Sequence, residues 1–580
     1  MLKRLAKCVR EFKKPTILTL IFIIGEAVIE CIIPFVTTDM VNKIQAGAGI
    51  TEILKIGGVL ILLAVLSLCC GGIAGFTCAK ASSGFAKNLR SDLFEKVQTY
   101  SFANIDKFSS SSLVTRLTTD VTNVQMAFMM IIRIAIRAPL MFIFSIIMAY
   151  IMGGALATSF VVIIPILAVG LYLVSRKAMP AFRSVFKKYD RLNESIEENV
   201  RGMRVVKGFA REDYEKKKFG TAAENIRADF TRAERIVALN TPLMQICMNF
   251  NMAFVLLIGS KLIISNQGAT IQVGQISGML TYGMQILMSL MMVAMIYVML
   301  TMSAESAKRI YEVLSEEPTL RQPEKPVTSV TDGSVDFDNV SFKYSQTAEN
   351  FALSDIDLHI KSGMTVGILG GTGSSKSTLV QLIPRLYDVT EGSVRVGGVD
   401  VRDYDIETLR GAVAMVLQKN LLFSGTIKEN LRWGNENATD EELVEACRLA
   451  QADDFVRSFP DGYDTKIEQG GTNVSGGQKQ RLCIARALLK KPKILILDDS
   501  TSAVDTKTDA FIRMGFAKYI PETTKIIIAQ RVSSVQDADL IIVMNGGRID
   551  AMGTHSELLE TSSIYREVYE QQTNGGKDDE

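Results

Sequence analysis

Histidine is scarce in this chain, and neither sign of charge dominates it. Its 580 residues include two histidines, His359 and His555, and the formal net charge is +2. A net charge this close to zero lacks the excess of lysine and arginine that is typical of nucleic-acid-binding proteins. The eight cysteines form no CxxC pair and lie mostly in apolar runs, which favours small buried thiols in a reducing compartment. We therefore expect reduced cysteines and no nucleic-acid partner.

The chain also lacks a secretory cleavage signal. Its basic start, MLKRLAKCVREFKK, leads into an apolar run that is too long for a signal peptide and has no small-residue cleavage site. We expect a first transmembrane helix with its N-terminus in the cytoplasm.

Apolar sequence is abundant before residue 305 or so. The chain is 48% hydrophobic, with a mean hydropathy of +0.20, which is high for a wholly soluble protein. About 20 apolar residues cross a bilayer core of about 30 Å. Six stretches are long enough: 16–38, 54–79, 129–152, 155–176, 241–264 and 273–302.

The connections between these stretches differ in charge. The short ones, 41–52, 153–154 and 265–270, carry little charge, whereas 80–128 and 177–240 are long and rich in lysine and arginine. The positive-inside rule places both long connections in the cytoplasm. Apolar residues at helical spacing predict that they are helices continuing below the membrane, with turns near 101–107 and 211–215. Ordinary cytosolic helical hairpins are the alternative.

Charged residues inside the stretches allow two interpretations. Glu26 and Glu30 in the first, and Arg133 and Arg137 in the third, are each spaced to share one helix face. They could form the polar wall of a substrate cavity that favours cationic compounds. Alternatively, glutamates and arginines pair between helices, or the arginines reach the inner interface.

The sixth stretch is rich in methionine, which adapts to dissimilar apolar ligands. Met288, with Tyr282 and Gln285 nearby, suggests a substrate cavity. The alternative is that methionine simply fills apolar space.

A linker separates two domains. Residues 315–333 combine three prolines with scattered charge. We expect an all-α transmembrane domain at 1–314 and an α/β nucleotide-binding domain at 334–575.

A phosphate-binding loop opens the second domain. A predicted strand, 365–369, leads into Gly370, Gly371, Thr372, Gly373, Ser374, Ser375, Lys376, Ser377 and Thr378. Backbone N–H groups at the following helix would surround phosphates, with Lys376 on the β/γ oxygens and Ser377 on Mg²⁺. Ser375 stands where glycine is usual, and its Cβ could strain the loop or crowd the phosphate.

Further motifs follow in a fixed order. Gln418 ends a predicted strand, Ser475, Gly476, Gly477 and Gln478 open a helix after Val474, Asp498 ends an apolar strand, and Asp505 follows shortly after. Together with the P-loop, these motifs resemble the ATPase domain of ABC transporters. The six apolar stretches resemble the exporter type, whose helices extend into the cytoplasm.

The resemblance implies roles for individual residues and a place in the cell. Tyr344 would stack on adenine, unless it is merely a core tyrosine. Gln418 would contact Mg²⁺ and sense the γ-phosphate, Asp498 would hold Mg²⁺ through water, and Asp505 would communicate with the opposing subunit. Segments 101–107 and 211–215 would be coupling helices. It also implies ATP and Mg²⁺ as cofactors and a multi-pass protein of a bacterial cell membrane with a cytoplasmic ATP-binding domain.

Two catalytic positions depart from the pattern. Asp499 stands where glutamate is expected, and its carboxylate is set back by roughly 1–1.5 Å, while a misplacement of about 1 Å can cost about 10²-fold in rate. Gln530 stands where histidine is expected, and neither His359 nor His555 follows the predicted strand 525–529. An amide cannot carry the charge of an imidazolium, although it can donate to a phosphate. The alternative is that both are tolerated variants in an active site.

The chain has one P-loop and one Val474–Gln478 signature, and in ABC transporters each ATP lies between the P-loop of one subunit and the signature of the other. The sequence resembles the degenerate-site subunit of bacterial heterodimeric exporters of amphipathic small molecules, drugs or lipids. Its partner would be a homologous half-transporter with the catalytic glutamate and switch histidine. The alternatives are a homodimeric exporter or lipid flippase with slow turnover, and an ATP-gated regulator that transports nothing.

Overall fold

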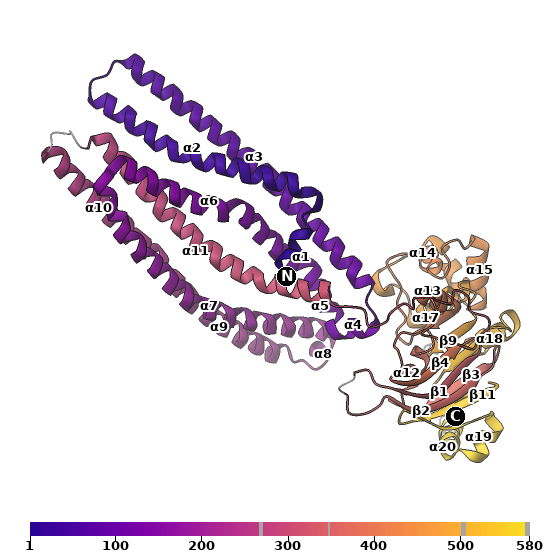
Figure 1. The fold of residues 1–580 in the computed structure, drawn as a ribbon. Coiled ribbons are helices and arrows are strands. Elements are labelled where there is room, and N and C mark those ends of the chain that lie inside the picture. The colour runs from indigo at the N-terminus through magenta and orange to yellow at the C-terminus, as the bar shows by residue number, and fades with distance from the viewer. Residues whose placement is uncertain (266–270, 346–347, 500–505, 575–580) are drawn as a thin grey trace. The chain divides into compact units, whose positions relative to one another are not determined.

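The structure, a computed structural model, describes residues 1–265, 271–345, 348–499 and 506–574. The chain forms two compact units (Figure 1). The first comprises Met1–Thr99 and Ser109–Glu316, and the second comprises Tyr100–Phe108 and Glu317–Glu580. The second unit therefore includes a short segment that the sequence places between the second and third apolar stretches.

The first unit is helical throughout the residues described. Its long helices are α2 (Lys13–Gln45), α3 (Ile50–Gln98), α6 (Val121–Gly153), α7 (Thr158–Arg201), α9 (Glu212–Val237), α10 (Asn240–Ser265) and α11 (Val273–Ser315). Shorter helices are α1 (Leu2–Lys7), η1 (Arg10–Phe12), α5 (Ser110–Thr115), η2 (Arg116–Asp120), η3 (Gly154–Ala157) and α8 (Met203–Gly208). Six helical segments among the described residues are long and apolar enough to cross a membrane. The predicted set of six spans is confirmed.

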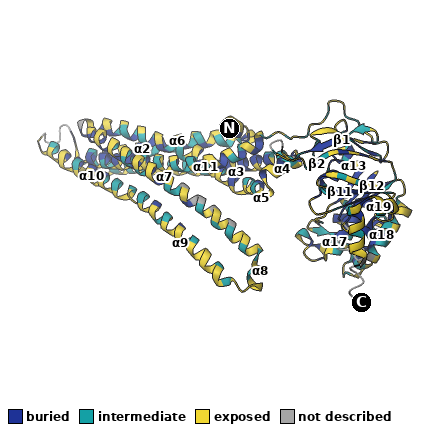
Figure 2. Ribbon diagram, turned by 90° about the horizontal axis from the view of Figure 1, so that it is seen from below, coloured by how far each residue is buried: buried dark blue, intermediate teal, exposed yellow. Residues whose placement is uncertain are grey.

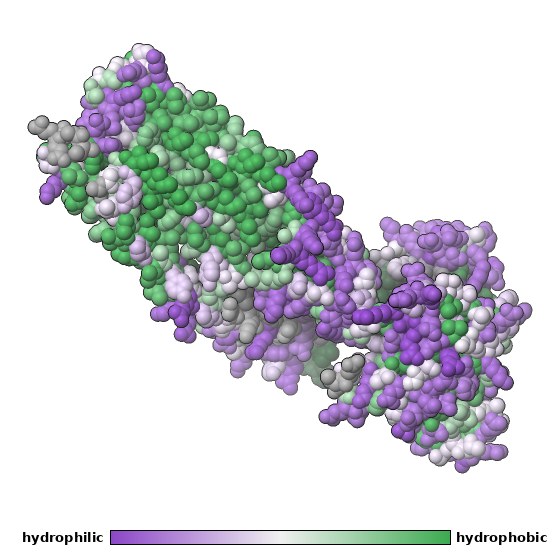
Figure 3. Space-filling view, viewed as in Figure 1, coloured by the Kyte–Doolittle hydropathy of each residue, from purple (hydrophilic) through white to green (hydrophobic). Residues whose placement is uncertain are grey.

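On the face that Figure 3 shows, the middle of the helical unit is largely apolar (green) and its ends are hydrophilic (purple). The most apolar window of α3 has 0% of its residues buried, and Figure 2 colours many positions on the helices as exposed. Apolar side chains facing outward at this density would be costly in water but suit a bilayer, where lipid tails cover them.

One predicted turn was misplaced. We expected a connector at 211–215, but α7 ends at Arg201, α8 follows, and α9 already begins at Glu212. Glu212, Asp213 and Glu215 lie in the first turn of α9, where carboxylates interact favourably with the helix dipole. These acidic residues start the helix, so the chain reverses before them.

The second unit is an α/β fold, and its described residues form three sheets. Its strands are β1 (Val335–Phe342), β2 (Leu353–Ile360), β3 (Thr365–Gly370), β4 (Glu391–Val396), β5 (Val399–Asp400), β6 (Val413–Val416), β7 (Gly425–Thr426), β8 (Lys466–Ile467), β9 (Ile494–Asp498), β10 (Thr524–Ile528), β11 (Leu540–Asn545) and β12 (Arg548–Gly553). The sheet orders are β2-β1-β4-β5, β12-β11-β3-β10-β9-β6 and β7-β8. With the helical first unit, this confirms the predicted fold class.

Helices cover this fold. They are α4 (Phe102–Phe108), α12 (Lys376–Gln381), α13 (Ile406–Ala412), α14 (Ile427–Arg432), α15 (Asp440–Leu449), α16 (Asp453–Ser458), α17 (Gly476–Leu489), α18 (Thr506–Tyr519), α19 (His555–Thr561) and α20 (Ser563–Asn574), with 3-10 turns η4 (Gly462–Asp464), η5 (Gln469–Gly471) and η6 (Val532–Ser534).

The parallel part of the large sheet positions the site. Strands β11, β3, β10, β9 and β6 run parallel, and both β9 and β10 are buried along their whole length. The carboxyl ends of parallel strands meet at one edge of a sheet, where ligands bind in such folds. The P-loop after β3, Gln418 after β6, Asp499 after β9 and Gln530 after β10 therefore converge.

Candidate nucleotide-binding site

The P-loop wraps around its own lysine. Lys376 Nζ donates to the carbonyl oxygens of Gly370 and Gly371, at 2.8 Å each, and burial lowers the pKa of the ammonium below its ordinary value. A Cβ on Gly370 would lie 2.2 Å from the carbonyl oxygen of Met544 in β11, so only glycine fits there. The loop is thus formed by close backbone contact, as anion-binding loops are.

Ser375 lies in a left-handed conformation, with φ of 68° and ψ of 24°. This region costs an L-residue roughly 1–2 kcal/mol. Its side chain makes no capping hydrogen bond to α12 that would offset the cost. The strain anticipated from the sequence at this position is present in the backbone.

Ser377 and Asp498 form the oxygen-rich side of the site. Ser377 Oγ donates to Asp498 Oδ1 at 3.0 Å, and burial raises the pKa of Asp498, with the hydrogen bond from Ser377 opposing the shift. A hydroxyl, a carboxylate and the amide oxygen of Gln418 are oxygen ligands of the kind that Mg²⁺ takes. The three side chains line one cavity, so the donor set fits the ion.

The two altered positions, Asp499 and Gln530, are in direct contact. Gln530 Nε2 donates to Asp499 Oδ2 at 2.8 Å, and Gln418 Nε2 donates to the same oxygen at 3.2 Å. Burial raises the pKa of Asp499, opposed by these two hydrogen bonds and by Lys376. Its backbone is left-handed, with φ of 47°. Two neutral amides therefore hold the carboxylate.

The cavity beside these residues has a volume of about 530 Å³. Glycines and polar groups of the P-loop line one side. Ile564, Tyr565 and Val568 of α20 line another, a wall that motif reasoning missed. The spacing of Ile564 and Val568 by four residues was the available signal, because such residues share a helix face.

Tyr344 lies beside the P-loop helix and is half exposed. Its hydroxyl pairs with Thr378 Oγ1 at 2.9 Å, and its ring meets that of Tyr387 edge to face at 5.2 Å. Tyr387 in turn donates to Asp106 Oδ2 of α4 at 2.8 Å. The segment expected to couple the domains, 101–107, is therefore in contact with the tyrosine expected to stack on adenine, through Tyr387.

The signature motif forms a fully capped helix start. Ser475 Oγ accepts from the Gln478 N–H at 3.3 Å, and Gln478 Oε1 accepts from the Ser475 N–H at 2.9 Å. Gly476 and Gly477 make the first turn of α17 after the buried Val474. Among the described residues, those lining the P-loop cavity do not include this motif. The signature is not part of the chain's own P-loop site, and Asp505 lies outside the described residues.

Comparison with known proteins gives the family. Residues 16–291 match the ABC transporter transmembrane region and residues 353–502 match the ABC transporter model. The chain is 38% identical over 555 residues to the ABC transporter ATP-binding protein YfiB of Bacillus subtilis, covering 96% of each chain. The chain belongs to the ABC transporter family.

Two further comparisons show proteins that are similar to this transporter in sequence or in fold. It is 32% identical to the fatty acid ABC transporter ATP-binding/permease protein of Mycobacterium bovis, over 83% of this chain and 75% of that protein. Its fold matches a bacterial Atm1-family ABC exporter solved with ATP bound, with a TM-score of 0.83 at 23% identity, over 97% and 98% of the two chains. The chain combines one transmembrane domain and one ATP-binding domain of the ABC transporter family in a multi-pass membrane protein, and it shares the fold of this exporter.

Among the four charged residues singled out in the membrane spans, Arg137 pairs with the two glutamates. Arg137 Nη2 on α6 donates to both carboxylate oxygens of Glu30 on α2, each at 2.7 Å, and lies 3.6 Å from Glu26. Arg133, one turn earlier, is exposed. The inter-helix pairing considered from the sequence is thus present for Arg137.

The other candidate cavity residues differ in burial. Tyr282 is completely buried and donates to the Cys31 carbonyl of α2 at 2.6 Å. Gln285 accepts from Ser145 of α6 at 3.1 Å. Met288 is exposed. Tyr282 and Gln285 connect α11 to neighbouring helices, whereas Met288 is accessible at the helix surface.

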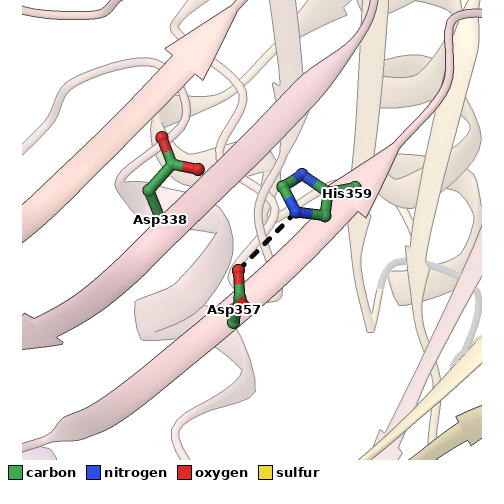
Figure 4. A group of neighbouring side chains, drawn as sticks. All are labelled: Asp338, Asp357 and His359. Carbon is green, nitrogen blue, oxygen red and sulfur yellow. Dashed lines mark ion pairs between the residues drawn. The ribbon is translucent and has the colours of Figure 1, made fainter.

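A group of possible metal ligands lies on the antiparallel sheet (Figure 4). It consists of Asp338, Asp357 and His359. Asp338 already accepts from Ser393 and pairs with Arg395, and His359 bonds Asp336 at 2.8 Å. Asp357 and His359 are exposed and Asp338 is half-buried, and the group is explained as a surface ion-pair network.

Proposed function

We propose that this chain is the degenerate-site half of a heterodimeric ABC exporter. The observation that carries the proposal is the capture of Asp499 by the amides of Gln418 and Gln530, at 3.2 and 2.8 Å. A short carboxylate and a neutral amide stand where water activation and charge stabilisation are needed.

The chain's own residues suit ATP binding better than ATP cleavage. Hydrolysis of the γ-phosphate depends on a precisely positioned water and on stabilisation of charge. Lys376 and the P-loop amides supply binding, and Ser377, Asp498 and Gln418 would hold Mg²⁺, which would offset phosphate charge when bound. Asp499 is set back and shared between two donors, and Gln530 cannot become cationic. We infer that this site retains ATP as a clamp.

The signature would serve the partner's ATP. Its capping box fixes Ser475 at the start of a helix of 14 residues, whose N-terminal N–H groups favour an anion. A partner half-transporter that brings the catalytic glutamate and switch histidine would complete the productive site.

We further propose that the exporter moves amphipathic small molecules. The methionine-rich α11 exposes Met288, and one relative carries the name of a fatty acid transporter. The bacterial relatives support the plasma membrane as its location, with the ATP-binding unit in the cytoplasm.

The test is the ATPase activity of the chain purified alone and of the complex that co-purifies from its native membrane. We expect slow turnover alone, faster turnover in the complex, and little change in the complex on Asp499→Asn. Robust turnover of the isolated chain that Asp499→Asn abolishes would refute the heterodimer. Nucleotide-driven shape change without substrate flux in vesicles would instead identify a regulator.

A further inference from the structure

The C-terminal helix α20 is anchored in the core next to the P-loop cavity. Tyr565 is 1% exposed and its hydroxyl bonds His555 Nδ1 at 2.7 Å. Ile564 and Val568, one turn apart, line the cavity and pack against the core cluster that includes Val532. Anchored in this way, the helix holds its next turn at a defined place.

Gln572 is on that next turn, on the same face as Ile564 and Val568. Its Nε2 donates to the carbonyl oxygen of Gln530 at 2.8 Å, and its Oε1 accepts from the N–H of Val532 at 2.8 Å. One side-chain amide thus satisfies a backbone acceptor and a backbone donor on the two sides of Arg531. The NH₂ group of the amide serves as a donor and its oxygen serves as an acceptor, as the chemistry of each atom requires.

The bonded segment carries the altered switch residue. Strand β10 ends at Ile528, so Gln530 lies beyond the last residue that the sheet holds in the ladder. Its side chain nevertheless reaches Asp499 Oδ2 at 2.8 Å. The amide of Gln572 therefore gives the backbone on both sides of Arg531 a support that the sheet does not supply.

We propose that Gln572 is the positioning residue for Gln530. By holding the backbone of residues 530 and 532, it directs the Gln530 amide toward Asp499 and the cavity, and it connects the C-terminal helix to the group that meets the γ-phosphate. This rests on the part of the proposed function in which ATP occupies the cavity beside Gln530, and it is independent of the heterodimer.

The test compares Gln572→Met, which keeps side-chain length without hydrogen bonding, with Gln571→Met. Gln571 is the matched control because its amide bonds only Glu567 of the same helix among the contacts described. The full-length chain in its membrane complex is photolabelled with 8-azido-ATP, and unlabelled ATP or ADP with Mg²⁺ competes. We expect Gln572→Met to weaken competition by ATP about 3- to 10-fold, as for loss of a hydrogen bond, and competition by ADP less than about 2-fold. Gln571→Met should change neither.

Equal weakening of ATP and ADP competition would overturn the proposal, because a merely structural tether does not distinguish the γ-phosphate. An unchanged ATP affinity would overturn it as well. On a Gln530→Ala background, Gln572→Met should add nothing; an additive effect would show that Gln572 does not act through Gln530. Absence of labelling of the unsubstituted chain would instead refute ATP binding at this P-loop.

Discussion

The P-loop corner and the signature helix belong to one domain, yet they are built differently. At the P-loop corner, Ser375 and Asp499 both adopt positive φ, at 68° and 47°, and two buried carboxylates adjoin. At the signature, Ser475 has an ordinary extended backbone, with φ of −68°, and both bonds of its capping box are made. Of these two motifs, only the P-loop corner has non-glycine residues with positive φ and altered chemistry, while the motif that the chain would lend is intact. This contrast supports a division of labour between the two nucleotide sites.

The largest expected effect is on the signature. Ser475→Ala should lower the ATPase rate of the complex by about 100-fold or more, as for loss of a donor at a transition state. It also removes a helix cap worth about 1 kcal/mol.

Thr439→Ala controls for the loss of the cap, because Thr439 caps α15 with the same box, made with Glu442. It should lower stability similarly and leave ATPase nearly unchanged. If Ser475→Ala and Thr439→Ala lower the ATPase rate equally, Ser475 acts only by stabilising its helix. The contrast between the P-loop corner and the signature would then be wrong.

Restoring the altered corner should have a smaller effect of opposite sign. Asp499→Glu combined with Gln530→His is expected to raise the ATPase rate of the complex about 2-fold, because two sites would then turn over. Steady-state phosphate release measures it, with each single substitution as a control. An unchanged rate in the double variant would show that other groups disable this site.

Relief of backbone strain sharpens the comparison further. Ser375→Gly should stabilise the nucleotide-free protein by about 1 kcal/mol, since glycine adopts positive φ without the steric cost, and raise the melting temperature of a domain this size by about 2–4 °C. Thr372→Gly is the control, because Thr372 lies in the same loop without positive φ. A comparable gain from Thr372→Gly would argue against strain at Ser375.

The smallest effect concerns the buried charge of Asp499. Burial raises the pKa of Asp499 in the folded state, so the folded protein favours the protonated carboxyl. The stability that this group contributes to folding is therefore present below the ordinary carboxyl pKa and is lost as pH rises through the raised pKa. At pH 7 the nucleotide-free Asp499→Asn variant should therefore have a higher melting temperature than the unsubstituted nucleotide-free protein. This difference in melting temperature should shrink as the pH is lowered toward about 4. A difference that grows on acidification would contradict this account.

Motifs predicted the elements of the site, but not their mutual contacts. The P-loop, Gln418, Asp498 and the signature were identified from residue types and spacing. The cavity wall of α20 and the link from Asp106 through Tyr387 to Tyr344 were not predicted, because no motif relates residues so far apart. The turn expected at 211–215 was wrong because the acidic residues there start a helix rather than end one.

Hydropathy alone determined the six spans, because about 20 apolar residues suffice to cross a bilayer, whichever helices pack beside them. Local sequence likewise determined the P-loop, a motif of consecutive residues. Only the tertiary structure brought Asp499 to Gln530, 31 residues away, and Gln530 to Gln572, 42 residues away. Such contacts depend on which strands lie side by side and on where a distant helix packs, and these are set by the burial of the whole core rather than by any short segment.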